Sequence, residues 1–158
     1  MNKTTKNPKV ELTPIIEEHD EVILLCERIR LGLRNKVDAK RIKKYIDWFK
    51  ANYLDAHFDM EQKNIFPILG ENNVRVKRAL ANHRRLNRLF AETAELNKIL
   101  HKIEEELSSY INFEERILYK EIQLVATEQQ LEVIENGEQQ IVFSDETWKD
   151  RFWLSLSA

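Results

Sequence analysis

The stretch that decides the fold is His57-Phe58-Asp59-Met60-Glu61, because a stretch of similar design, Tyr110-Ile111-Asn112-Phe113-Glu114-Glu115, follows 53 residues later. Each stretch lies in a long segment with helical periodicity and places a donor side chain four residues before a glutamate. Four residues is just over one turn, so both side chains leave the same face and can meet at one point. Together with the histidines His19 and His83 of two other segments, this pattern indicates a metal centre inside a helical bundle.

Composition narrows the class of protein. A chain of 158 residues is most simply one domain with a substantial core, and its three glycines, three prolines and 33% charged residues favour long amphipathic helices. A net charge of -2 gives no reason to expect nucleic acid or a membrane as partner. No apolar run approaches the roughly 20 residues that span a bilayer, and the polar start lacks a signal-peptide core. With Cys26 as the single cysteine, no internal disulfide can form, and a cytoplasmic location is expected.

The order of apolar stripes and helix boundaries predicts an all-α fold, an up-down-up-down four-helix bundle with short C-terminal helices. Residues 1–11 are expected to form a flexible N-terminal arm, 12–126 the bundle, and 127–158 a C-terminal helical extension. Thr13-Pro14 favours the start of the first helix, Asp38 can cap the second, and Pro67 and Gly70 mark its end. Asn72 or Asn73 opens the third helix, and a weakly signalled break between residues 92 and 96 precedes the fourth.

The extension carries its own signals. Thr127 followed by Gln130 is typical of a capping box, and Gly137 suits a helix end, so residues 128–136 are predicted to be helical. Farther on, Trp148, Phe152 and Leu156 are spaced four apart, with Trp153 beside them, as in a small amphipathic helix. Aromatic mass of this kind is expected to dock on the bundle or on a second subunit, which would give a homodimer.

Five side chains are expected to point inward at a shared site: His19, His57, Glu61, His83 and Glu114. A single inward histidine is more often a hydrogen-bonded core residue, but three on successive helices beside two costly buried carboxylates favour a bound cation. Imidazole and carboxylate ligands suit iron, manganese or zinc. His101 also precedes a glutamate by four residues, yet it stands nine residues before Tyr110, about half a turn off, and is expected to face solvent.

The order His19, His57-x-x-x-Glu61, His83, then Glu114-Glu115, with Phe66-Pro67 after the first motif, resembles the hemerythrin-like (HHE) cation-binding family over roughly residues 12–124. That resemblance implies a four-helix bundle that holds two non-haem irons. It implies His19, His57 and His83 as terminal ligands and Glu61 and Glu114 as bridges between the metals. It also implies a protein that binds or senses dioxygen, a peroxide, nitric oxide or iron, whereas enzymatic turnover is left open.

Tyr110 departs from the family pattern, in which the second motif begins with histidine. A phenol has a pKa near 10 in water and binds well only when the metal displaces its proton. Three outcomes stay open: a phenolate-ligated diiron centre, a diiron centre with an extra open position, or a mononuclear or metal-free relic. A fourth interpretation makes Tyr110 a core aromatic whose hydroxyl bonds Glu61 or Glu114.

Other classes of site find less support. A ferritin-like centre needs Glu-x-x-His pairs, and residues 16, 54, 80 and 98, three before each histidine, are not glutamates. Arginines and lysines along residues 75–88 are most simply a solvated face paired with Glu104-Glu105-Glu106. The competing hypothesis is a helical interaction or regulatory module whose metal site is degenerate or purely structural.

Overall fold

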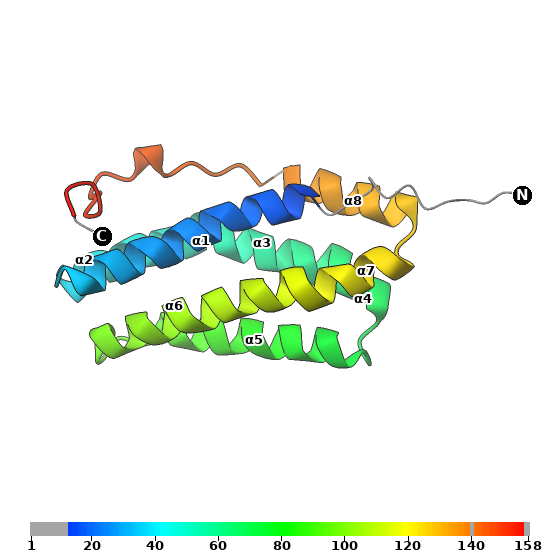
Figure 1. Cartoon of the computed structure of the whole chain (residues 1–158), viewed down its shortest axis with the longest axis horizontal. Coiled ribbons are helices and arrows are strands. Elements are labelled where there is room, and N and C mark those ends of the chain that lie inside the picture. The colour runs from blue at the N-terminus through cyan, green and yellow to red at the C-terminus, as the bar shows by residue number, and fades with distance from the viewer. Residues whose placement is uncertain (1–12, 140, 157–158) are drawn as a thin grey trace, which may run out of the picture.

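Helices dominate the computed structural model, which describes residues 13–139 and 141–156 (Figure 1). The elements are α1 (Thr13–Arg34), α2 (Ala39–Phe49), η1 (Lys50–Leu54), α3 (Asp55–Met60), η2 (Glu61–Ile65), α4 (Phe66–Leu69), α5 (Val74–Ala91), α6 (Leu96–Phe113), η3 (Glu114–Leu118), α7 (Tyr119–Val125), α8 (Glu128–Gln139) and η4 (Asp145–Thr147). No strand occurs within these ranges, so the all-α class is confirmed. The arm predicted for residues 1–11 lies outside the described residues.

The helices join into long rods that lie side by side (Figure 1). The first is α1 and the third is α5, whereas the second runs through α2, η1, α3, η2 and α4 without a break and the fourth through α6, η3 and α7. The fourth rod packs against both α1 and α5. This arrangement brings side chains from all four rods to the space between them. The strict up-down-up-down order stays a prediction.

The helix boundaries follow from local chemistry. Asp38 caps α2 by accepting the backbone N–H of Lys40, and Asn73 caps α5 by accepting two backbone N–H groups. Gly70 ends α4 with a φ of 88°, a left-handed conformation that favours glycine. The break before α6 has no glycine, and Glu95 adopts a φ of 52° there. A non-glycine residue in this conformation leaves little sequence signal, which is why the break is weakly marked.

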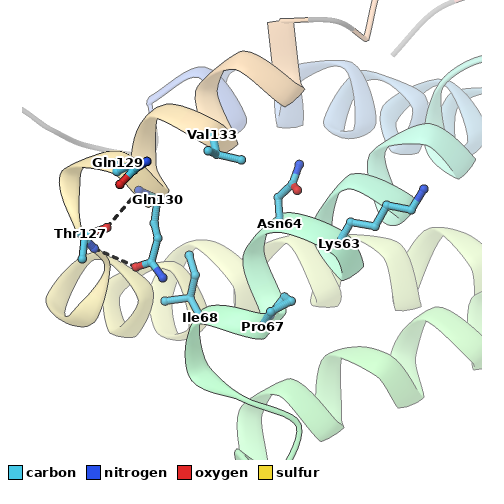
Figure 2. A pocket seen from close by; sticks show the side chains of 8 residues that line it. All are labelled: Lys63, Asn64, Pro67, Ile68, Thr127, Gln129, Gln130 and Val133. Carbon is cyan, nitrogen blue, oxygen red and sulfur yellow. Dashed lines mark hydrogen bonds between the residues drawn. The ribbon is translucent and has the colours of Figure 1, made fainter.

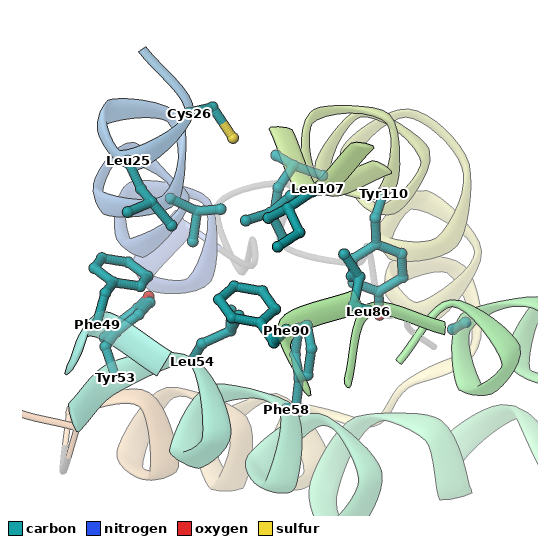
Figure 3. Packing of buried hydrophobic residues seen from close by; sticks show 14 of the residues in the cluster. Leu25, Cys26, Phe49, Tyr53, Leu54, Phe58, Leu86, Phe90, Leu107 and Tyr110 are labelled. Atoms are coloured by element: carbon teal, nitrogen blue, oxygen red, sulfur yellow. The ribbon is translucent and has the colours of Figure 1, made fainter. Parts of the chain in front are cut away.

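The core fills the space between the rods, and Figure 3 shows part of it. Figure 3 shows aromatic and aliphatic side chains of all four rods pointing toward one another, among them Leu25, Phe49, Tyr53, Leu54, Phe58, Leu86, Phe90 and Leu107. All eight are at most 5% exposed. Close-packed apolar walls of this kind exclude water from the polar residues that lie among them.

The α8 helix begins with the predicted capping box. The Thr127 N–H donates to Gln130 Oε1 at 2.9 Å, and the Gln130 N–H donates to Thr127 Oγ1 at 3.1 Å (Figure 2). Both residues line a groove between α8 and the η2–α4 part of the second rod. Gly137 does not end this helix, which continues to Gln139, so the predicted end at residue 136 is wrong. A Cβ at Gly137 would lie 3.2 Å from Met60 Cγ, and glycine therefore permits α8 to approach the second rod.

The C-terminal segment, residues 141–156, does not form the predicted amphipathic helix. It contains the short η4 and a series of turns, and it runs back along the bundle from α8 toward the α2 end (Figure 1). Its aromatic rings pack on α2: Phe152 is 4% exposed, and Trp148 and Trp153 lie 5.8 and 4.7 Å from the Tyr45 ring. A helix this short is unstable by itself, so the packing of the rings on α2 determines the backbone conformation of the segment.

None of the helices described is both long enough and apolar enough to cross a membrane.

Candidate metal centre

The six predicted site residues lie at one level of the bundle and come from all four rods. His19 belongs to α1, His57 to α3, His83 to α5 and Tyr110 to α6, whereas Glu61 opens η2 and Glu114 opens η3. Each is at most 1% exposed. His101 is exposed, as the sequence predicts.

Four of these residues form a cluster suited to a cation. His19, His57, Glu61 and Glu114 each offer one ligand atom, and these atoms all lie within 4.8 Å of one another. His19 Nε2 lies 3.2 Å from Glu114 Oε1, and His57 Nε2 lies 3.5 Å from Glu61 Oε2. The structure therefore brings together two imidazoles and two carboxylates from three of the four rods.

His83 and Tyr110 approach the same cluster through the other oxygen of Glu61. His83 Nε2 lies 2.9 Å from Glu61 Oε1 and 2.7 Å from the Tyr110 hydroxyl, which itself donates to Glu61 Oε1 at 3.1 Å. Tyr110 thus makes the contact with Glu61 that the core-aromatic interpretation expects. Its oxygen also lies beside a possible second ligand, His83.

Tyr119 is a further residue of the site that the sequence patterns miss. This buried side chain donates its hydroxyl to Glu61 Oε2 at 2.7 Å, and its oxygen lies 3.3 Å from His19 Nε2. Its ring stacks on the His19 imidazole, with centroids 5.5 Å apart and planes at 21°. The internal repeat carries a signal for Tyr119. It stands nine residues after Tyr110, and Phe66, which packs beside His83, stands nine residues after His57 at the corresponding position.

Widened helical turns explain why Tyr119 reaches the site. The Tyr119 N–H bonds the carbonyl of Glu114, and the Phe66 N–H bonds that of Glu61, so each is an i+5 contact that defines a π-turn. In a regular α-helix, residue i+5 is rotated about 140° around the helix axis from residue i, so Tyr119 would point away from Glu114. The π-turns bring it back over the carboxylate. Such turns occur often at functional sites.

The outer nitrogens of two histidines are also held. Glu115 Oε2 lies 2.7 Å from His19 Nδ1, and Gln62 Nε2 lies 2.9 Å from His83 Nδ1. Gln62 is exposed, and it lines a surface groove of about 410 Å³ together with Phe66, Val76 and Leu80. Gln62 and Phe66 therefore both lie between His83 and this groove.

Without a cation, the pKa values of the neighbouring Glu61 and Glu114 carboxyl groups shift in opposite directions. The neighbouring Glu114 carboxyl, His57 and His83 outweigh the effect of burial and hold the pKa of Glu61 well below its usual value. Burial and the charge on Glu61 raise the pKa of Glu114 well above its usual value. Burial, followed by the charges of Glu114 and Glu61, also raises the pKa of both Tyr110 and Tyr119. A positive ion in the cluster would reverse these preferences.

Glu114 provides the test of whether a metal fits. Both of its carboxyl oxygens are buried, and neither makes a hydrogen bond of normal geometry with the described residues, although Oε1 lies near His19. A buried oxygen without a partner is costly, and a cation held between Glu114 and the histidines would satisfy it. Imidazole and carboxylate donors suit iron, manganese or zinc. The residues present therefore fit a metal ion.

Comparison with known proteins gives one match. The family model for the hemerythrin HHE cation-binding domain matches residues 12–120, more than half of the chain. No curated protein and no solved structure matches the chain. The matched range contains all six predicted site residues together with Tyr119. The chain thus belongs to the hemerythrin HHE cation-binding domain family.

Proposed function

We propose that this chain binds non-haem iron, two ions at full occupancy, in an up-down-up-down four-helix bundle, and that it uses the iron to bind or sense dioxygen, a peroxide or nitric oxide. The observation that carries the proposal is the buried cluster of His19, His57, Glu61 and Glu114, in which the oxygens of Glu114 make no hydrogen bond of normal geometry with the part of the chain that the structure describes. Manganese or zinc would fit the same donors.

Different side chains would bind each of the two ions. His19 and His57 would hold one ion, His83 and Tyr110 would hold the second, and Glu61 and Glu114 would be shared between the two. Bound ferrous iron would supply electrons and an open position for a small oxidant. Tyr119 holds Glu61 in place through a 2.7 Å hydrogen bond, and its hydroxyl is a proton donor inside a water-poor site.

Access supports a small ligand. The metal-binding cluster is buried, and packed aromatic rings cover it on the α2 side, where Tyr53 stacks on His57 with ring centroids 5.7 Å apart. On the α5 side the groove of Gln62, Phe66, Val76 and Leu80 reaches the neighbours of His83. Diatomic molecules and peroxide are small enough for such a route, whereas a larger substrate would require the helices to separate.

Anaerobic loading with ferrous iron, followed by gel filtration and elemental analysis, tests the proposal. We expect about two irons per chain in the wild type and a clear loss in His57→Asn. His101→Asn is the matched control, because His101 has the same side chain on an exposed face, and it should bind as the wild type does. Equal, non-specific binding by all three proteins would reject the proposal in favour of a helical interaction module with a lost or structural site.

A further inference from the structure

The residue that follows each of the two glutamates, Glu61 and Glu114, contacts the outer nitrogen of a histidine on a neighbouring rod. After Glu61, the Gln62 amide reaches His83 Nδ1 on α5 at 2.9 Å. After Glu114, the Glu115 carboxylate reaches His19 Nδ1 on α1 at 2.7 Å. The two contacts are related by the internal repeat, but one partner is a charged carboxylate and the other a neutral amide.

This difference sets the proton position on each imidazole. A carboxylate can only accept a hydrogen bond, so Glu115 requires the proton of a neutral His19 to sit on Nδ1. His19 Nε2 then presents its lone pair to the cluster. In that state His19 is already arranged to hold a cation.

His83 has the opposite arrangement. Gln62 Nε2, an amide donor, lies 2.9 Å from His83 Nδ1, and an Nδ1 that accepts this hydrogen bond leaves the imidazole proton on Nε2. Nε2 lies 2.7 Å from the Tyr110 hydroxyl and 2.9 Å from Glu61 Oε1, the two acceptors for that proton. A cation bound at Nε2 would require this proton to move to Nδ1 and the Gln62 amide to rotate so that its oxygen accepts. His83 is therefore arranged for the metal-free state.

The possible metal ligands on the two sides also differ, and they too favour the His19 side. The His19 side has two imidazoles and two carboxylates within 4.8 Å. The His83 side has one imidazole, the shared Glu61 Oε1 and the Tyr110 hydroxyl, whose proton a metal would have to displace. Both the donors and their outer partners make the His83 side the weaker one.

We propose that Glu115 and Gln62 are positioning residues that make the two metal subsites unequal, so that the first ion binds on the His19 side and the second binds more weakly beside His83. The inference rests on the proposed function, since it assumes that the cluster holds metal. It goes further, because it assigns an order of filling and names the two outer residues that set it.

Histidine tautomers in the metal-free protein test the positioning role directly. Nitrogen-15 NMR of the imidazoles should show His19 protonated at Nδ1 and His83 at Nε2. Gln62→Glu should move the His83 proton to Nδ1 and leave His19 unchanged. The same tautomer for both histidines in the wild type would overturn the inference without any metal being added.

Anaerobic calorimetric titration with ferrous iron, repeated with cobalt(II) by visible absorption, tests the order of filling. We expect two steps in the wild type, with affinities that differ by at least about tenfold. Glu115→Gln should weaken the first step by about 10- to 100-fold, and Gln62→Glu should tighten the second by a similar factor. Glu105→Gln, an exposed change on α6, is the control.

The failures are distinguishable. Two equal steps in the wild type, or saturation after one ion, would overturn the inequality while metal binding stands. Variants at positions 62 and 115 that alter both steps alike would overturn the assignment of their roles. No specific step in the wild type would instead overturn the proposed function itself.

Discussion

Tyr119 and Glu61 are 58 residues apart in the chain, yet the Tyr119 hydroxyl donates to Glu61 Oε2 at 2.7 Å in the buried centre of the bundle. The bond joins the second rod to the fourth. It also keeps one carboxylate oxygen turned toward His57, which lies 3.5 Å from the same atom. The hydroxyl therefore affects both the stability of the bundle and the orientation of a proposed ligand.

Tyr119→Phe should lower the free energy of unfolding of the metal-free protein by about 1–3 kcal/mol, because Glu61 loses a charge-assisted hydrogen bond in a buried place. Urea denaturation followed by circular dichroism measures the change. Asn112→Ala, an exposed change on α6, should have a much smaller effect. An unchanged midpoint in Tyr119→Phe would show that water or another group replaces the hydroxyl.

Aerobic iron loading should produce a visible absorption band if Tyr110 binds ferric iron as a phenolate. Tyr110→Phe should lose this band, and Tyr119→Phe should keep it, because only Tyr110 occupies the histidine position of the repeated motif. Absorption spectra of the three iron-loaded proteins measure the difference. A band that survives in Tyr110→Phe would argue against ligation by this residue and leave it as the hydrogen-bond partner of Glu61.

Glu114→Gln should separate metal binding from stability. The pKa of Glu114 is raised in the folded protein, so above the unfolded value near 4.5 the folded state holds a proton that the unfolded state releases, and stability falls as pH rises. The glutamine variant lacks this loss. At pH 7 its metal-free form should be at least as stable as the wild type, with the advantage shrinking as pH falls toward 4.5.

The same variant should bind iron more than about tenfold less tightly, since a direct ligand matters at least as much as an outer partner. Denaturation at several pH values and calorimetric titration measure the two effects. A Glu114→Gln protein that is both less stable at pH 7 and unimpaired in metal binding would contradict the roles assigned to this side chain.

Cys26 should react slowly with thiol reagents. Burial raises the pKa of this thiol from 9.0 to about 11, so the reactive thiolate is scarce at neutral pH. Between pH 9.0 and about pH 11, the Cys26 thiol loses its proton in the unfolded chain but keeps it in the folded chain. The free energy of unfolding should therefore fall as the pH rises through this range. Alkylation rates in folded and urea-unfolded protein test the first point. Cys26→Ala should remove its share of the pH dependence, and an equally fast reaction of the folded thiol would refute its protection.

Arg28→Ala should loosen the C-terminal segment. The Arg28 guanidinium lies 3.9 Å from the Trp153 ring centroid, donates to the Tyr45 hydroxyl at 2.7 Å, and pairs with Asp145. Loss of these contacts should lower stability by about 1–3 kcal/mol and speed proteolysis after residue 140. Arg41→Ala is the control, because its pair with Asp150 is exposed and contributes little. Equal proteolysis of both variants would show that ring packing alone holds the segment.

Helical spacing predicts which side chains of one helix come together inside the bundle. His57 with Glu61, and Tyr110 with Glu114, share a face because they are one turn apart, and the structure brings them together with His19 and His83. Tyr119 could not be predicted in this way, because its reach depends on an i+5 turn that has no residue signature of its own. Contacts such as that of Glu115 with His19 join different rods, and a periodicity on one helix carries no information about them.

The helix predicted for the C-terminal segment does not form, and the reason is different. The spacing of Trp148, Phe152 and Leu156 is compatible with a helix, but each ring finds its partner on α2, and Tyr45 alone contacts three rings of this segment. Packing between distant parts of the chain outweighs a weak local preference in so short a stretch.

The π-turns at Glu61 and Glu114 have a consequence for chain length. Each accommodates one residue more than a regular turn, so the apolar faces before and after it are out of register by about 100°. Deleting one residue from 61–65 would replace this π-turn with a regular turn and rotate Phe66 and the residues after it by about 100° out of their present contacts. Indels of a single residue, usually tolerated only in loops, are therefore expected to be most harmful in these two helices, beside the ligands.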